Sequence, residues 1–107
     1  MSALVLVDAE NVRRSTWPNL SREQLVERTR AWAAREGHEL VIVFDGPPPE
    51  DAPDLAGAAH ADDLLAELAR DARAEPLWVV TSDRELRRRV GERADRLVGG
   101  GAFVRAI

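Results

Sequence analysis

The sequence predicts an α/β fold in three layers, with a mainly parallel sheet of about four strands between helices. Apolar runs at residues 4–7, 40–44 and 77–80 have the length and composition of strands. Helical patterns of about 10–15 residues separate them, as in parallel βαβ units. The runs do not alternate apolar and polar residues, which is expected where helices cover both faces of a sheet. The 107 residues are expected to form a single domain, 1–107.

The first long helix is predicted between the first two strands. Ser21 is a good N-cap, and Gln24 three residues later completes a capping box. Trp32 lies on the apolar face of this helix and is assigned to the core. Gly37 suits the position just past the last turn, where helices commonly stop. The second strand is therefore expected to begin almost at once, near Glu39.

Four prolines follow the second strand, within residues 47–53. Proline has no backbone N–H and cannot continue a helix or a central strand, so a surface loop is expected here. The next helix is predicted from about Ala61 to Ala72, with leucines at helical spacing. Two aspartates in its first turn suit the positive end of the helix dipole.

The C-terminal third is predicted to contain a helix and an edge strand. Ser82 and Glu85 form a second capping box, which opens a helix that runs to about Arg93. Leu97 is expected in a fourth strand at the sheet edge. Beyond the three glycines at 99–101, the remaining residues fit either a turn of helix or a strand.

The composition excludes several kinds of site. The chain has no cysteine, which rules out a disulfide framework and thiolate zinc sites. All 15 basic residues are arginine, so the lysines of P-loop proteins, receiver domains and many haloacid-dehalogenase-like phosphatases are missing. No apolar run approaches the roughly 20 residues of a membrane span, and the N-terminus lacks the basic start of a signal peptide. A cytoplasmic protein without a membrane partner is expected.

Aspartates stand at or just beyond the end of each of the first three predicted strands. Asp8 follows the first strand, Asp45 the second and Asp83 the third, while Asp62 and Asp63 open a predicted helix. The carboxyl ends of parallel strands meet at one edge of a sheet, where ligands bind. Carboxylates gathered there repel one another unless a hard cation neutralises them. We therefore expect a site for Mg²⁺ or Mn²⁺ that acts on phosphate.

Amide and hydroxyl groups accompany these carboxylates. Asn11 lies three residues after the first aspartate, and Thr81 and Ser82 precede the last one. Together they make an oxygen-rich set of donors, which suits Mg²⁺ or Mn²⁺ rather than zinc. Each aspartate read alone also has a structural explanation as a turn or helix-end residue, and Asp45 before a glycine is expected to be structural or supporting.

Four segments of the chain resemble motifs of NYN domains, in particular those of the YacP-like branch. They are residues 7–12 with the later Trp17-Pro18, the V-F-D-G of residues 43–46, the A-D-D of residues 61–63 and the V-T-S-D-x-E-L segment of residues 79–86. The resemblance covers about residues 3–98. NYN domains belong to the PIN-like nuclease group, so the resemblance implies a PIN-like, Rossmann-like fold and a metal-dependent endoribonuclease.

The resemblance also implies roles for individual residues. Four carboxylates would form the catalytic, metal-binding cluster: Asp8, Asp62, Asp63 and Asp83. Four residues would support it: Asn11, Thr81, Ser82 and Asp45. Asn11 in particular would orient Asp8 or a metal-bound water. This chain has Ala9 where the family has glycine and Glu10 where an aromatic is common, and its segment before Asp62 is short and proline-rich where longer relatives place another strand.

RNA contacts are expected from arginines and a tryptophan near this cluster. Arg13 and Arg14 lie in the loop above the acidic edge, and Arg84 directly follows the last aspartate. Such side chains supply most contacts to nucleic-acid phosphates. Trp17 would either stack on an RNA base or pack over the sheet edge. RNA is thus the expected partner, and a small domain with short loops could also form a homodimer to complete its surface.

Two other functions remain open. A non-catalytic RNA-binding or scaffold domain would keep the fold with weak metal affinity, and the net charge of −4 favours it. A phosphatase or phosphotransferase of another α/β family is disfavoured by the missing lysine and by the missing D-x-D motif after the first strand, where Asp8 is followed by Ala9 and Glu10. Metal-dependent RNA cleavage separates the enzyme from both.

Overall fold

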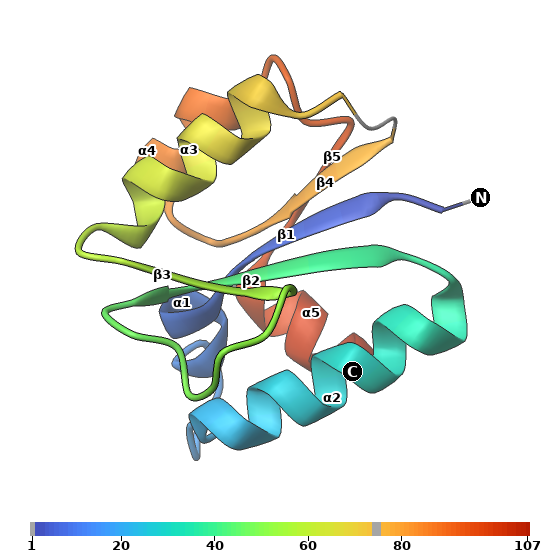
Figure 1. Ribbon diagram of the computed structural model, residues 1–107, viewed down its shortest axis with the longest axis vertical. Coiled ribbons are helices and arrows are strands. Elements are labelled where there is room, and N and C mark those ends of the chain that lie inside the picture. Colours follow the sequence, from blue (N-terminus) through green and yellow to red (C-terminus); the bar gives the residue numbers. More distant parts are fainter. Residues whose placement is uncertain (1, 74–75) are drawn as a thin grey trace.

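The computed structural model describes residues 2–73 and 76–107, which form an α/β fold around a five-stranded parallel sheet (Figure 1). Its strands are β1 (Leu4–Asp8), β2 (Glu39–Asp45), β3 (Leu55–Ala58), β4 (Leu77–Val80) and β5 (Arg96–Val98). Their order across the sheet is β3-β2-β1-β4-β5, and each neighbouring pair is parallel. The chain therefore reverses its direction of travel across the sheet between β1 and β4, the place where open α/β sheets bind ligands.

Helices cover both faces of the sheet and complete the three predicted layers. They are α1 (Ala9–Arg13), α2 (Arg22–Glu36), α3 (Ala61–Asp71), α4 (Arg84–Val90) and α5 (Gly100–Ala106). Helices α1, α2 and α5 lie on one face, and α3 and α4 lie on the other (Figure 1). Within the described ranges, no helix is both long enough and apolar enough to cross a bilayer.

Successive residues of each strand enter two different halves of the core. In β1, Val5 and Val7 belong to the half under α2, whereas Leu6 belongs to the half under α3. In β2, Phe44 and Val43 divide in the same way. Because both halves are apolar, the strands read in the sequence as unbroken apolar runs, as predicted.

Helix α2 has the predicted ends. The Ser21 hydroxyl accepts a hydrogen bond from the backbone N–H of Gln24, and the Gln24 side chain accepts one from the Ser21 N–H. Gly37 ends the helix in a left-handed backbone conformation, with a φ of 75°, which glycine adopts more readily than residues with a side chain. His38, predicted to have little role, accepts a hydrogen bond from the Ala3 N–H at 3.0 Å and so fastens the start of β1 to the start of β2.

The described part of the sheet has five strands, one more than predicted. Strand β3 begins just after the last proline of the loop and pairs with β2 at the edge of the sheet. Gly57 in β3 lies so close to the loop that a Cβ there would stand 2.3 Å from the carbonyl oxygen of Gly46. The strand was not predicted because its sequence, Leu55–Ala58, contains one large apolar side chain and a glycine, which is a weak strand pattern.

Helix α4 begins one residue later than its capping pattern predicts. Asp83, not Ser82, is the N-cap, because Oδ1 of Asp83 accepts a hydrogen bond of 2.9 Å from the backbone N–H of Leu86. The Ser82 hydroxyl instead accepts one of 2.8 Å from the N–H of Gly100. The undecided C-terminal segment is helical: it is α5, and its Phe103 side chain is buried in the core.

Candidate functional site

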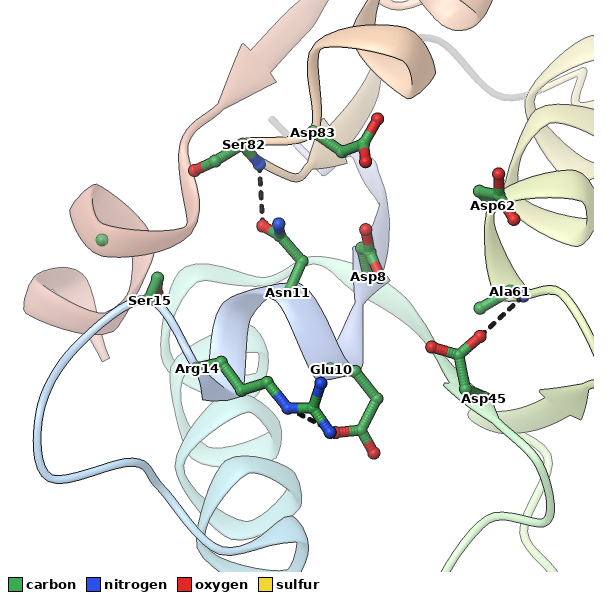
Figure 2. Close-up of a pocket in the computed structure, with 11 residues that line it drawn as sticks. Asp8, Glu10, Asn11, Arg14, Ser15, Asp45, Ala61, Asp62, Ser82 and Asp83 are labelled. Carbon is green, nitrogen blue, oxygen red and sulfur yellow. Dashed lines mark hydrogen bonds and ion pairs between the residues drawn. The ribbon is translucent and has the colours of Figure 1, made fainter.

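A pocket of about 600 Å³ opens at the carboxyl edge of the sheet, above the ends of β1, β2 and β4 (Figure 2). Carboxylates that line it are Asp8, Glu10, Asp45, Asp62 and Asp83. Other polar residues that line it are Asn11, Arg14, Ser15 and Ser82. The reversal between β1 and β4 thus brings together residues from the first, middle and last thirds of the chain, as the sequence predicts for a parallel sheet.

Asp8 is the most buried of the predicted cluster residues. Asp8 is 8% exposed, and its Oδ2 accepts a hydrogen bond of 2.8 Å from the Thr81 hydroxyl. Burial raises the pKa of Asp8 from its ordinary value of 3.8 to about 6; the Thr81 hydrogen bond opposes this rise, and the negative charges of Asp45 and Asp83 add to it. A cation bound in the pocket would favour the charged form of this carboxyl group.

Thr81 links Asp8 to the loop that follows β4. This buried hydroxyl donates to Asp8 and also accepts a hydrogen bond of 3.1 Å from the backbone N–H of Asp83. Asp83 in turn uses Oδ1 to cap α4. The position of each of the two carboxylates therefore depends on the same hydroxyl group.

The Asn11 side chain holds the backbone around the pocket, while the backbone N–H of Asn11 donates to the Asp8 carboxylate and lowers its pKa. Oδ1 of Asn11 accepts a hydrogen bond of 2.8 Å from the backbone N–H of Ser82 (Figure 2). Gly100, whose N–H donates to the Ser82 hydroxyl, lies so near that a Cβ on it would stand 3.1 Å from Asn11 Oδ1. The side-chain oxygen of Asn11 thus ties α1 to the loop after β4, and the side chain that orients Asp8 is Thr81.

The aspartates on the other side of the pocket differ in their partners. Asp45 Oδ1 accepts a hydrogen bond of 3.0 Å from the Ala61 N–H and fixes the start of α3 (Figure 2). Asp62 lines the pocket and lies 3.8 Å from a guanidinium nitrogen of Arg89. Asp63 instead forms an ion pair of 2.8 Å with Arg89 of α4 and is not among the described residues that line the pocket. The fold therefore brings Asp62, but not Asp63, to the pocket that Asp8 lines.

Glu10 belongs to the pocket but was not predicted as a site residue. This carboxylate is buried and forms ion pairs with Arg13 at 2.9 Å, Arg22 at 3.1 Å and Arg14 at 3.9 Å. The sequence contains part of this signal, because Arg13 and Arg14 follow Glu10 at helical spacings of three and four residues. Arg22 stands twelve residues away in another helix, and only the fold brings it to Glu10.

The predicted RNA-contacting residues occupy different environments. Arg13 is half-buried and donates a second hydrogen bond, of 3.1 Å, to the carbonyl of Leu20. Arg14 is exposed and lines the pocket, and Arg84 is exposed on the first turn of α4. Trp17 is 88% exposed, so the expectation that it packs over the sheet edge is wrong.

The arrangement of the elements resembles that of a solved structure, the W164L mutant of Rae1 (YacP) from Bacillus subtilis. The two structures superpose with a TM-score of 0.78 over 95% of this chain and 72% of that one, at 19% sequence identity. The chain has a YacP-like fold. No protein-family model matches the sequence, and no curated protein matches it.

The pocket has the donor chemistry of a site for a hard divalent cation. Asp8, Asp62 and Asp83 offer carboxylate oxygens, the ligands that Mg²⁺ and Mn²⁺ prefer. The negative charges that raise the pKa of Asp8 are also those that a cation would offset. In the arrangement seen for residues 2–73 and 76–107, no three acidic or histidine side chains are already close enough to enclose an ion. Binding would therefore require side-chain movement, chiefly of the exposed Asp62, whose contact with Arg89 is a long one of 3.8 Å.

Proposed function

We propose that this chain is an endoribonuclease that depends on Mg²⁺ or Mn²⁺ and hydrolyses RNA phosphodiester bonds at the pocket above β1 and β4. The observation that carries the proposal is the buried Asp8 carboxyl, whose pKa of about 6 reflects burial and two negative neighbours. Like charges held together in this way are typical of functional sites. The NYN-like motifs and the YacP-like fold support the same activity.

Asp8, Asp62 and Asp83 are the residues that would hold the metal. Glu10 is less suited, because arginines already neutralise it. Asp63 is less suited too, because it pairs with Arg89 at 2.8 Å and does not line the pocket, whereas Asp62 lies farther from Arg89, at 3.8 Å, and lines the pocket. When bound, a divalent ion lowers the pKa of water and stabilises negative charge on a phosphate.

The residues of the chain itself prepare this site. Thr81 holds the Asp8 carboxylate, which lines the pocket, through Oδ2. Asp83 is fixed at the start of α4 through Oδ1, which leaves Oδ2 for a ligand. Asn11 fixes the loop between them through the Ser82 amide. These contacts hold two carboxylates in place before a substrate arrives, which reduces the reorganisation that catalysis requires.

The products of this reaction would carry 5′-phosphate and 3′-hydroxyl ends. A metal held by these carboxylates would supply activated water for hydrolysis, and such chemistry does not need the ribose 2′-hydroxyl. The chain has two histidines, and they lie apart in the fold: His38 is beside the start of β2, and His60 precedes α3. They do not form the pair that a metal-independent ribonuclease uses. We expect the protein to meet its RNA in the cytoplasm.

A cleavage assay with matched aspartate variants tests the proposal. Single-stranded RNA is incubated with the wild type in Mg²⁺, in Mn²⁺ and in EDTA, and the ends of the products are identified. Asp8→Asn should abolish cleavage, whereas Asp51→Asn, an exposed aspartate of the proline-rich loop, should not change it. Full activity of Asp8→Asn, or equal cleavage in EDTA, would refute the proposal.

A non-catalytic RNA-binding domain is the second candidate. It is favoured by the structural partners of the predicted metal ligands: Asp62 and Asp63 pair with Arg89, and Asp83 caps the first turn of α4. RNA binding without cleavage in either Mg²⁺ or Mn²⁺ would select this candidate.

A further inference from the structure

Glu10 lies at the centre of a cluster of arginines beside the acidic pocket. We call this group the Glu10 cluster; its members are Glu10, Arg13, Arg14 and Arg22. Arg13 and Arg22 reach Glu10 at 2.9 and 3.1 Å from α1 and α2. Arg14 stands 3.9 Å from Glu10, and Figure 2 shows these two side chains. Three guanidinium groups share one carboxylate, so the cluster carries two uncompensated positive charges at the rim of an acidic pocket.

Two of these arginines are held firmly. Arg13 also donates to the carbonyl of Leu20, at 3.1 Å. Arg22 lies over the ring of Phe44, at 5.7 Å, and its Nη1 and Nη2 donate to the carbonyl oxygens of Pro47 and Asp45, each at 3.5 Å. They therefore form a fixed positive base between α1, α2 and the end of β2.

Arg14 differs from its two neighbours. Its side chain is 65% exposed and lines the pocket. Within the described part of the chain, Arg14 forms a long ion pair with Glu10 through Nε. Its two terminal nitrogens can therefore donate to a ligand. An arginine in this position can bind a phosphate with two parallel hydrogen bonds.

We propose that the Glu10 cluster is a phosphate subsite of the pocket. It binds a backbone phosphate of single-stranded RNA next to the nucleotide at the acidic edge, and Arg14 is the residue that reaches this phosphate. Glu10 acts as an internal counter-ion that holds the arginines in place before RNA arrives. The inference rests on the proposed function for its ligand, and it names the side of the pocket along which the strand continues.

The position of the cluster favours a single strand as the occupant. Trp17, with its exposed ring, lies three residues beyond Arg14 on the same connection between α1 and α2. A phosphate contact followed by an aromatic surface is how proteins bind unpaired nucleotides, whose bases can stack on the ring. The cluster also supplies positive charge where a protein of net charge −4 must hold RNA against its own carboxylates.

Salt dependence of RNA binding tests the subsite. A fluorescent single-stranded RNA is titrated by anisotropy from 50 to 200 mM salt, with Ca²⁺ replacing Mg²⁺ and a gel showing that the RNA stays intact. In Arg14→Ala, the slope of log affinity against log salt should be less steep by about 0.7. Over this range, the affinity of the variant should therefore fall about 2.5-fold less than that of the wild type. Arg14→Lys, which keeps the charge, should keep the slope. Arg28→Ala, an exposed arginine of α2, is the matched control and should behave as the wild type.

Each alternative result has a meaning. If Arg14→Ala has the same slope as Arg28→Ala, the cluster is only a structural tie between α1 and α2 and the proposal is wrong. If inorganic phosphate binds the wild type but not Arg14→Ala while the RNA salt slopes of the two proteins are equal, the cluster is a site for free phosphate only and the proposal is also wrong. A flattened slope in a protein that cleaves no RNA would leave the subsite standing and refute the proposed nuclease. Cleavage by the wild type with an unchanged Arg14→Ala slope would refute the subsite alone.

Discussion

The Thr81 hydroxyl donates a hydrogen bond of 2.8 Å to Oδ2 of Asp8, across 73 positions of the sequence. The bond connects β1 and β4 at the point where the order of strands reverses. It stabilises the charged form of a carboxylate that burial destabilises, since this bond lowers the pKa of Asp8 against the larger effect of burial. The protonation state of Asp8 near neutral pH therefore depends on the Thr81 hydroxyl.

Replacing Thr81 with valine should move the pH dependence of cleavage. Thr81→Val removes the donor to Asp8 but keeps the shape of the side chain, so the pKa of Asp8 should rise above about 6. The acid limb of the pH–rate profile should shift to higher pH, and cleavage at pH 6 should fall more than cleavage at pH 8. Thr81→Ser, which keeps the hydroxyl, is the control and should restore the profile. Identical profiles for valine and threonine would remove this bond from the mechanism.

Asp8 should make the folded protein less stable as the pH rises from 4 to 6. Its pKa is about 6 in the folded state and 3.8 ordinarily, so between these values the folded state binds more protons than the unfolded state. The free energy of unfolding then decreases with pH and loses about 3 kcal/mol by pH 7, as an order-of-magnitude upper bound. Asp8→Asn removes this titration. It should be more stable than the wild type at pH 8 and close to it at pH 4.

Urea denaturation of the two proteins at pH 4, 6 and 8 measures this difference. Asp51→Asn, at an exposed position, is the control for the loss of one negative charge. Its free energy of unfolding should stay close to that of the wild type at all three pH values. An Asp8→Asn protein that is less stable than the wild type at pH 8 would show that the carboxylate is a structural residue.

Mg²⁺ or Mn²⁺ should stabilise the wild type and not Asp8→Asn. An ion that binds only the folded state adds about 2.7 kcal/mol to the free energy of unfolding at 100-fold excess over its dissociation constant. The carboxylates that repel one another around Asp8 are the source of this affinity. Thermal melts with and without millimolar metal provide the measurement, and Ca²⁺ should bind without supporting cleavage. An unchanged melting temperature in both metals would favour the scaffold function.

Two substitutions at Asp83 should separate its capping of α4 from the role in catalysis that we propose for it. Asparagine is as good an N-cap as aspartate, so Asp83→Asn should keep the bond to the Leu86 N–H and most of the stability. Asp83→Ala removes this cap and should cost about 1 kcal/mol. Both variants should lose metal-dependent cleavage, because both lose the carboxylate. Full activity of Asp83→Asn in the same cleavage assay would mean that the residue is only a cap.

The sequence predicted the parts of the structure that depend on local patterns. Capping residues at both ends located α2, and apolar runs located β1, β2 and β4. Strand β3 was missed because its stability comes from pairing with β2 and from the close contact between Gly57 and Gly46, neither of which leaves a strong pattern in four residues.

The site was predicted in outline but not in its side-chain partners. Strand ends in a parallel sheet had to bring Asp8 and Asp83 to one edge, and topology alone was enough for that. The pairing of Glu10 with Arg22, and of Asp63 with Arg89, is set by how helices pack across 12 and 26 positions of sequence. These ion pairs decide which carboxylates remain available to bind a metal, and they cannot be predicted from local sequence patterns.

Replacing Trp17 should weaken RNA binding without changing its dependence on salt. The ring is 88% exposed, so Trp17→Ala should leave the melting temperature unchanged. Stacking of a base on an aromatic ring contributes about 1–3 kcal/mol and involves no released counter-ions. Affinity for single-stranded RNA should therefore fall at every salt concentration, with a slope like that of the wild type, and Trp17→Phe should recover part of the loss. Arg14→Ala should show the opposite pattern, a changed slope, which makes the two variants controls for each other. An unchanged affinity for Trp17→Ala would show that the exposed ring does not contact RNA.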